Sequence, residues 1–190
     1  MSTNPVVQAI IGGTAPRPAR LAAARGMLPL PQNDRLEILI SLQATDDQEL
    51  SAAASETLDA ESPEDLLMVA KGEDSPLTVL SYLATRTESS RELHEAIVLN
   101  SQTPDEALAK LASTTTEGSL LELVAVNQQR LVRFPALIEA ILGNPARTPE
   151  AERRAKETKV EFFEKERGAR QIADELRARG QTAAAEFFEE

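Results

Sequence analysis

The chain has 190 residues, of which 42% are hydrophobic and 27% charged, and its formal net charge is −11. These proportions are typical of a folded globular protein and exclude disorder over the whole length; the absence of cysteine excludes disulfides, thiolate metal sites and a cysteine nucleophile. The acidity is concentrated in residues 36–129, where 18 acidic residues outnumber four basic ones, and such a surface repels phosphate backbones.

We therefore expect no nucleic-acid partner. The N-terminal residues lack the basic segment and apolar run of a secretory signal, and no stretch approaches the ~20 apolar residues that span a membrane. We expect no membrane partner and a cytoplasmic location.

A recurring sequence pattern marks the expected helix starts. It consists of a small apolar segment, a Gly or Asn, a Ser or Thr, and a Pro, and its copies occupy residues 9–16, 61–64 (in part), 96–104 and 140–149. A hydroxyl side chain caps the free amides of a helix, and proline in the first turn loses no hydrogen bond. The anchor prolines are 47, 41 and 45 residues apart, at Pro16, Pro63, Pro104 and Pro149. This spacing is typical of HEAT-like helix pairs.

Apolar residues three and four apart predict the helices themselves. In chain order, the helical segments are expected after Pro16, at 35–42, at 46–58, after Ser62, after Ser75, at 90–99, after Thr103, at 120–126 and at 136–142. Thr103 and Glu106 have the spacing of a capping box.

The C-terminal part has a different composition. Residues 149–179 are highly charged and predict a long solvated helix, which Gly168 would break and Gly180 would end. Two copies of Glu-Phe-Phe-Glu, at 161–164 and 186–189, predict a helical hairpin that pairs its Phe faces. The chain reaches Glu190 inside an expected helix, as a piece of a longer protein would.

Residues 93–112 carry a short helix, an Asn, a Thr-Pro cap and a Leu-containing helix, with looser matches at 123–127, 134–137 and 143–150. This pattern resembles the α-solenoid superfamily, in particular HEAT-like and leucine-rich-repeat-variant arrays, over residues 5–155. The resemblance implies protein-binding surfaces. We predict an all-α fold: an α-solenoid of stacked helix pairs over residues 1–148, followed by charged C-terminal helices over 149–190 that form the hairpin.

No catalytic, cofactor or metal site is expected. His94 is the one histidine, and a zinc site needs three or four ligands. Gly12 and Gly13 precede a helix start but lack the spacing of a phosphate-binding loop.

The expected function is non-catalytic: an interaction or scaffold module that binds another protein, with homo-oligomers left open. Candidate partner-binding residues are a basic cluster and two late aromatic residues: Arg17, Arg20, Arg25, Phe187 and Phe188. The alternatives are a ligand-binding or enzymatic protein with a pocket between helices, and a nucleic-acid-binding HEAT-like protein.

Overall fold

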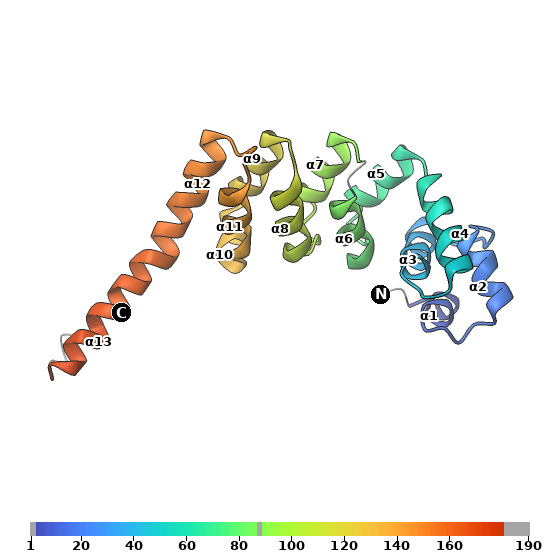
Figure 1. The fold of residues 1–190 in the computed structure, drawn as a ribbon, viewed down its shortest axis with the longest axis horizontal. Helices are drawn as coiled ribbons and strands as arrows, with labels where there is room; N and C mark the ends of the chain where they lie inside the picture. Colours follow the sequence, from blue (N-terminus) through green and yellow to red (C-terminus); the bar gives the residue numbers. More distant parts are fainter. Residues whose placement is uncertain (1–2, 87–88, 181–190) are drawn as a thin grey trace. The chain divides into compact units, whose positions relative to one another are not determined.

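A computed structural model describes residues 3–86 and 89–180 (Figure 1). Within these ranges every regular element is helical and no β-strand is present, which confirms the all-α prediction. The chain divides into two compact units, Met1–Leu111 (unit 1) and Ala112–Glu190 (unit 2). The division expected at residue 148 stays a prediction.

Unit 1 is built around α3. Its helices are α1 (Pro5–Ile11), α2 (Arg17–Ala24), α3 (Gln32–Gln43), α4 (Gln48–Asp59), α5 (Pro63–Lys71), α6 (Leu77–Thr85), α7 (Arg91–Leu99) and α8 (Asp105–Thr114), which ends beyond Leu111. Helix α3 packs against α1, α2, α4 and α6. Leu36, Ile38, Leu39 and Leu42 of this helix are at most 1% exposed. Burying each such side chain contributes about 1.5–3 kcal/mol, so α3 supplies much of the core.

The four anchor prolines lie at helix starts, as predicted. Pro16 and Pro104 immediately precede α2 and α8, and Pro63 and Pro149 are the first residues of α5 and α12 (Pro149–Lys159). The hydroxyl of Ser62 accepts a hydrogen bond from the Asp65 amide at 3.1 Å. Side-chain caps therefore mark the starts of α5 and α12, where Ser62 and Thr148 accept hydrogen bonds from backbone amides, whereas α2 starts without one.

The repeat distance differs from the prediction. Helices α5 and α7 begin 28 residues apart, at Pro63 and Arg91, and α6 and α8 do the same, at Leu77 and Asp105. A matching pair of buried hydrogen bonds confirms the register: Ser75 Oγ donates to the Val69 carbonyl at 2.5 Å, and Thr103 Oγ1 donates to the Ile97 carbonyl at 2.7 Å. The 41 residues between Pro63 and Pro104 are not this repeat distance, because Pro63 begins α5 whereas Pro104 precedes α8, which corresponds to α6.

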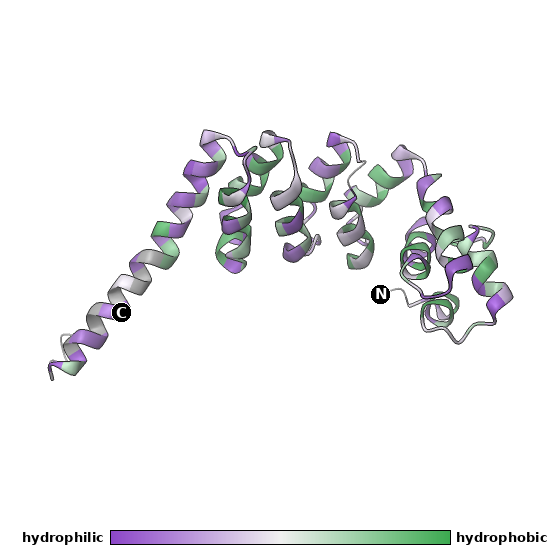
Figure 2. Cartoon of the chain, viewed as in Figure 1, coloured by the Kyte–Doolittle hydropathy of each residue, from purple (hydrophilic) through white to green (hydrophobic). Residues whose placement is uncertain are grey.

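Unit 2 contains α9 (Gly118–Val126), α10 (Gln128–Arg133), α11 (Ala136–Gly143), α12, the π-helix η1 (Val160–Glu164) and α13 (Lys165–Ala178). Helix α12 packs against α9, α10 and α11. Hydrophilic residues dominate α12 (Figure 2), and several of them form ion pairs one helical turn apart, such as Arg154 with Glu150. The expected charged helix is thus present.

The expected break at Gly168 was wrong, because α13 runs through this residue and the helix instead widens at η1. Helix α13 ends at Ala178, and Gly180 adopts a φ of 76°, which glycine tolerates without strain. The second arm of the predicted hairpin, with Phe187 and Phe188, lies outside the described residues.

Candidate functional site

Two helices of unit 1 carry no charged residue. The sequence of α1 is PVVQAII and that of α6 is LTVLSYLAT. Helices at the surface of a soluble protein normally present charges to water, yet Val6 of α1 is 49% exposed and Leu77 of α6 is 51% exposed. These uncharged helices point to a surface that suits an apolar contact.

An open groove runs along these helices. A hollow of about 470 Å³ lies between α1, α3 and the start of α6, and a second of about 620 Å³ lies along α6 and α8. Ile40 and Thr78 line both hollows, so the two hollows are neighbours on the surface of unit 1. We call this surface the α1–α8 groove; its lining residues include Val7, Ile11, Ile40, Ala44, Leu77, Thr78, Tyr82 and Ala107. All of them belong to unit 1.

The spacing of residues in α6 gives the groove its wall. Thr78, Ser81, Tyr82 and Thr85 follow the i, i+3, i+4, i+7 pattern of one helix face, and all four line the groove. The opposite face of the helix is buried in the core through Val79, Leu80, Leu83 and Ala84. Helix α6 therefore anchors the core with one face and offers hydroxyl groups and exposed Leu77 with the other.

Few charges line the groove. Glu37 of α3 is 3% exposed, while Glu106 and Lys110 of α8 are exposed. Unit 1 as a whole has 17 acidic and eight basic residues, a net charge of −9. The groove is thus lined mainly by uncharged residues and belongs to a unit whose net charge is negative.

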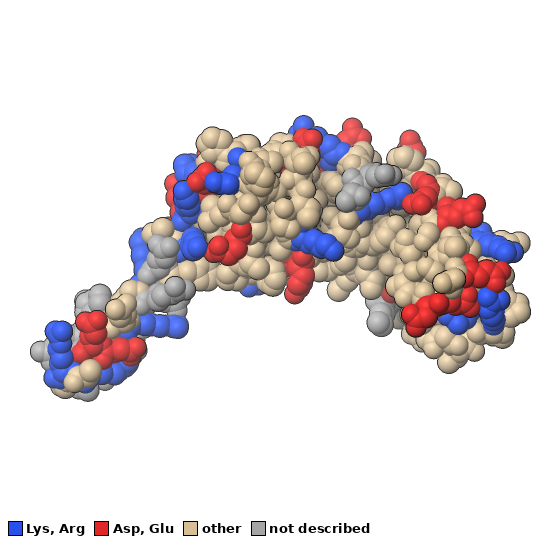
Figure 3. All heavy atoms as spheres, viewed as in Figure 1, with Lys and Arg blue, Asp and Glu red and all other residues tan. Residues whose placement is uncertain are grey.

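Two of the three predicted partner-binding arginines are paired within the chain. Arg17 donates from Nε to Asp47 Oδ2 at 3.0 Å and from Nη2 to Glu49 Oε2 at 2.6 Å, and Arg25 Nη2 lies 3.8 Å from Glu49 Oε1. Hydrogen bonding to Asp47 is the main reason that the pKa of Arg17 is raised, and the same bond lowers the pKa of Asp47. Acidic and basic side chains lie together over this α1–α4 end of unit 1 (Figure 3).

Arg20 differs from its neighbours, because its Nε is buried and has no hydrogen-bond partner. Among the aromatic residues of the first Glu-Phe-Phe-Glu, Phe162 is exposed and Phe163 is half-buried. The structure does not bring either of them together with the arginines into one described site.

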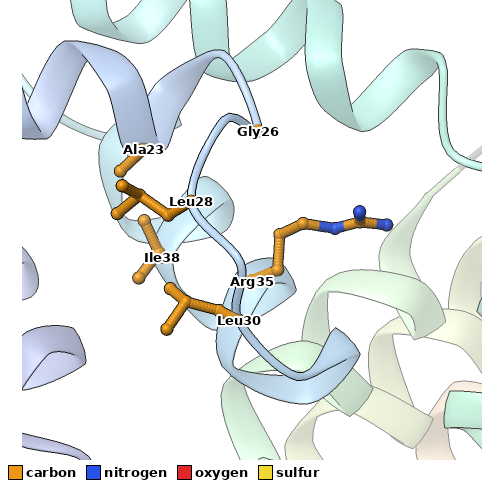
Figure 4. Close-up of a pocket in the computed structure, with 6 residues that line it drawn as sticks. All are labelled: Ala23, Gly26, Leu28, Leu30, Arg35 and Ile38. Atoms are coloured by element: carbon orange, nitrogen blue, oxygen red, sulfur yellow. The ribbon is translucent and has the colours of Figure 1, made fainter.

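A third hollow, between α2 and α3, is too small to admit a water molecule. Figure 4 shows Ala23, Leu28, Leu30 and Ile38 gathered around it, while the Arg35 side chain extends away. Arg35 pairs instead with Glu61, at 2.7 Å. This hollow is part of the core packing.

His94 has the properties of a packed histidine. It is half-buried, its Nε2 is enclosed without a hydrogen-bond partner, and burial lowers its pKa against the opposing effect of a hydrogen bond with the Arg86 backbone. In residues 3–86 and 89–180, no three His, Asp or Glu side chains are grouped closely enough to hold a metal ion. None of the helices described has both the length and the apolar composition to cross a bilayer.

Comparison with known protein families, curated proteins and solved structures returned no match to this chain.

The groove was not predicted from the sequence. Residues 5–11 were not expected to be helical, and the wall residues of α6 are 33–78 positions from those of α1, of α3 and of its C-cap Ala44. A signal was nonetheless present, since residues 5–11 and 77–85 are uncharged segments in a chain that is 27% charged.

Proposed function

We propose that this chain is a non-catalytic interaction module that binds another protein in the α1–α8 groove. We further propose that its helix pairs form an α-solenoid, in which each pair stacks on its neighbours. The 28-residue correspondence between α5–α6 and α7–α8 supports the second proposal, because equivalent hydrogen bonds recur at equivalent positions.

One observation carries the functional proposal: α1 and α6 have no charged residue, although both line an open groove whose lining includes the large aliphatic side chain of Leu77, 51% exposed. Contact of such aliphatic groups with water costs free energy, and a partner that covers them recovers about 25 cal/mol for each Å² of apolar surface. Contiguous apolar grooves in repeat proteins are typical sites of protein recognition.

A pair of charge-neutral variants tests the proposal. Leu77→Asn places an amide on the groove, whereas Met68→Asn makes the corresponding change on α5 at a residue that is 72% exposed and does not line either groove hollow. We expect both variants to fold, because both residues are exposed. Wild-type, Leu77→Asn and Met68→Asn proteins would be used as baits in the same lysate and compared by quantitative mass spectrometry.

The expected result is a set of proteins that the wild type and Met68→Asn retain equally and that Leu77→Asn loses. Equal recovery with all three baits would refute the groove as the binding surface.

A further inference from the structure

We propose that the occupant of the α1–α8 groove is an amphipathic α-helix of a partner protein whose apolar face is flanked by Lys and Arg. This inference rests on the proposed function and specifies the chemistry of the partner.

The polar groups of the groove favour a helix over an extended segment. An extended segment brings about two unpaired backbone groups per residue, and each needs a hydrogen-bond partner when buried. The groove offers mainly hydroxyl side chains, and that of Thr85 already donates to backbone carbonyls of its own helix. A helix satisfies its backbone internally and requires only an apolar surface to pack against.

The dimensions of the groove also suit a helix. Helix α3 packs against both α1 and α6, and the second hollow joins α6 to α8. Packed helices lie about 8–10 Å apart, so a path across these four helices is about 25–30 Å long. That length corresponds to a helix of ~17–20 residues.

The net charge of unit 1 indicates which charged residues flank the apolar face of the occupant. Unit 1 has a net charge of −9; in the groove lining Glu37 is 3% exposed, whereas Glu106 and Lys110 are both exposed. Helices α1 and α6 contribute no charge, so the excess of acidic residues in the rest of unit 1 determines the sign of the field that an occupant meets. A basic helix is attracted to this surface, whereas a second copy of unit 1 is repelled by it.

The experiment uses two synthetic peptides of about 18 residues that share one apolar face, with Leu at i, i+3, i+4 and i+7. One peptide carries Lys on its polar face and the other carries Glu. Binding of each fluorescently labelled peptide to the full chain would be measured by anisotropy at low and high salt. We expect the Lys peptide to bind at least about tenfold more tightly than the Glu peptide, and salt to weaken its binding.

Matched variants locate the binding. Thr78 lines both hollows, so Thr78→Trp obstructs the groove, while Met68→Trp adds the same side chain to α5. Glu106→Gln removes a groove charge, and Glu64→Gln removes one from an exposed position of α5. We expect Thr78→Trp to weaken binding of the Lys peptide by about tenfold or more, and Glu106→Gln to weaken it by about twofold to fivefold. Both α5 variants should bind the Lys peptide as the wild type does.

Three results would overturn the inference. The first is equal binding of the two peptides, and the second is an equal effect of Glu106→Gln and Glu64→Gln on the affinity for the Lys peptide. The third is a wild-type dimer in light scattering that Thr78→Trp dissociates, because a second copy of the chain would then be the occupant. If neither peptide binds but Leu77→Asn still loses proteins from the lysate, the partner is not a basic helix and the proposed function stands.

Discussion

The side chain of Asn144 gives the sharpest test of how unit 2 is held together. Asn144 is 2% exposed. Its amide donates to the Ala112 and Thr115 carbonyls, both at 2.8 Å, and its Oδ1 accepts from the Ala146 amide at 2.8 Å. The two donated bonds connect the end of α11 to a segment about 30 residues earlier, and the accepted bond from Ala146 is local. The two carbonyls belong to the C-terminal turn of α8 and the loop that follows, where intrahelical partners run out.

The cost of removing this side chain follows from the number of bonds. A protein hydrogen bond contributes about 1 kcal/mol net, and a buried group left without a partner costs about 1–3 kcal/mol. We therefore expect Asn144→Ala to lower the free energy of unfolding by about 3 kcal/mol. The exposed Asn127 provides a control, since its side chain accepts one bond from the Arg130 amide, and Asn127→Ala should cost about 1 kcal/mol.

Asn144→Asp separates the donated bonds from the accepted one. The variant keeps the oxygen that accepts from Ala146 but directs a carboxylate at two carbonyls, which raises its folded-state pKa above about 3.9. The folded state then binds the additional proton more tightly than the unfolded state. The variant is consequently most stable relative to the wild type below about pH 4, and it loses that stability as the pH rises through the raised folded-state pKa.

Urea unfolding followed by circular dichroism measures these differences, and hydrogen exchange of the Ala146 amide reports the accepted bond directly. We expect exchange at Ala146 to accelerate in Asn144→Ala and to stay slower in Asn144→Asp. The reasoning is refuted if Asn144→Ala costs no more than Asn127→Ala, or if the stability of Asn144→Asp relative to the wild type does not change with pH.

Three further predictions concern other positions. Gly118→Ala would place a Cβ 2.8 Å from a backbone oxygen of a neighbouring loop, whereas Gly143→Ala meets nothing within 4 Å; thermal unfolding should show a loss of about 1–3 kcal/mol for the first and no loss for the second. Hydrogen bonds from two arginines, mainly Arg153, lower the pKa of Glu150 from 4.5 to about 2, so its carboxyl carbon in an NMR titration should shift with a midpoint near 2. Its stabilising effect should be complete above pH 4.5 and should be lost as the pH falls from there through the folded-state pKa. Burial lowers the pKa of His94, so its ring should titrate below 6.5 by NMR, and stability should fall as the pH drops below that value because the unfolded state then binds the proton more tightly.

Helix starts could be predicted from the sequence because their chemistry is local. The Ser62 hydroxyl and Pro63 act within one turn, and each landmark proline was found at a helix start. The repeat register was not predicted correctly, because a Ser followed by Pro lies at the start of both α5 and α6, although only Ser62 caps its helix with a side-chain hydrogen bond. The hydroxyls of Ser75 and Thr103 donate to carbonyls six residues earlier, in the preceding helix, although both residues resemble ordinary caps in the sequence.

The groove depends on distant segments and could not be predicted in the same way. Ile40 and Thr78 line both hollows although 38 residues separate them. Periodicity shows which face of α6 is buried, but it does not show which other helix faces the exposed side. The lack of charge in residues 5–11 and 77–85 was the available signal, and it would have identified the walls without showing that they adjoin.

The asparagine hydrogen bonds and the groove are connected within unit 1. Asn100 donates to the Ala70 and Gly72 carbonyls at 2.8 and 2.9 Å, as Asn144 does to its own pair of carbonyls. These bonds fix the end of α7 against the end of α5, and Thr103, three residues later, is then held by its bond to Ile97. Helix α8 begins at the next turn and contributes Glu106 and Lys110 to the groove. The position of the groove charges therefore depends on hydrogen bonds near the start of α8, because Thr103 is held two residues before Asp105 and Glu106 follows at once.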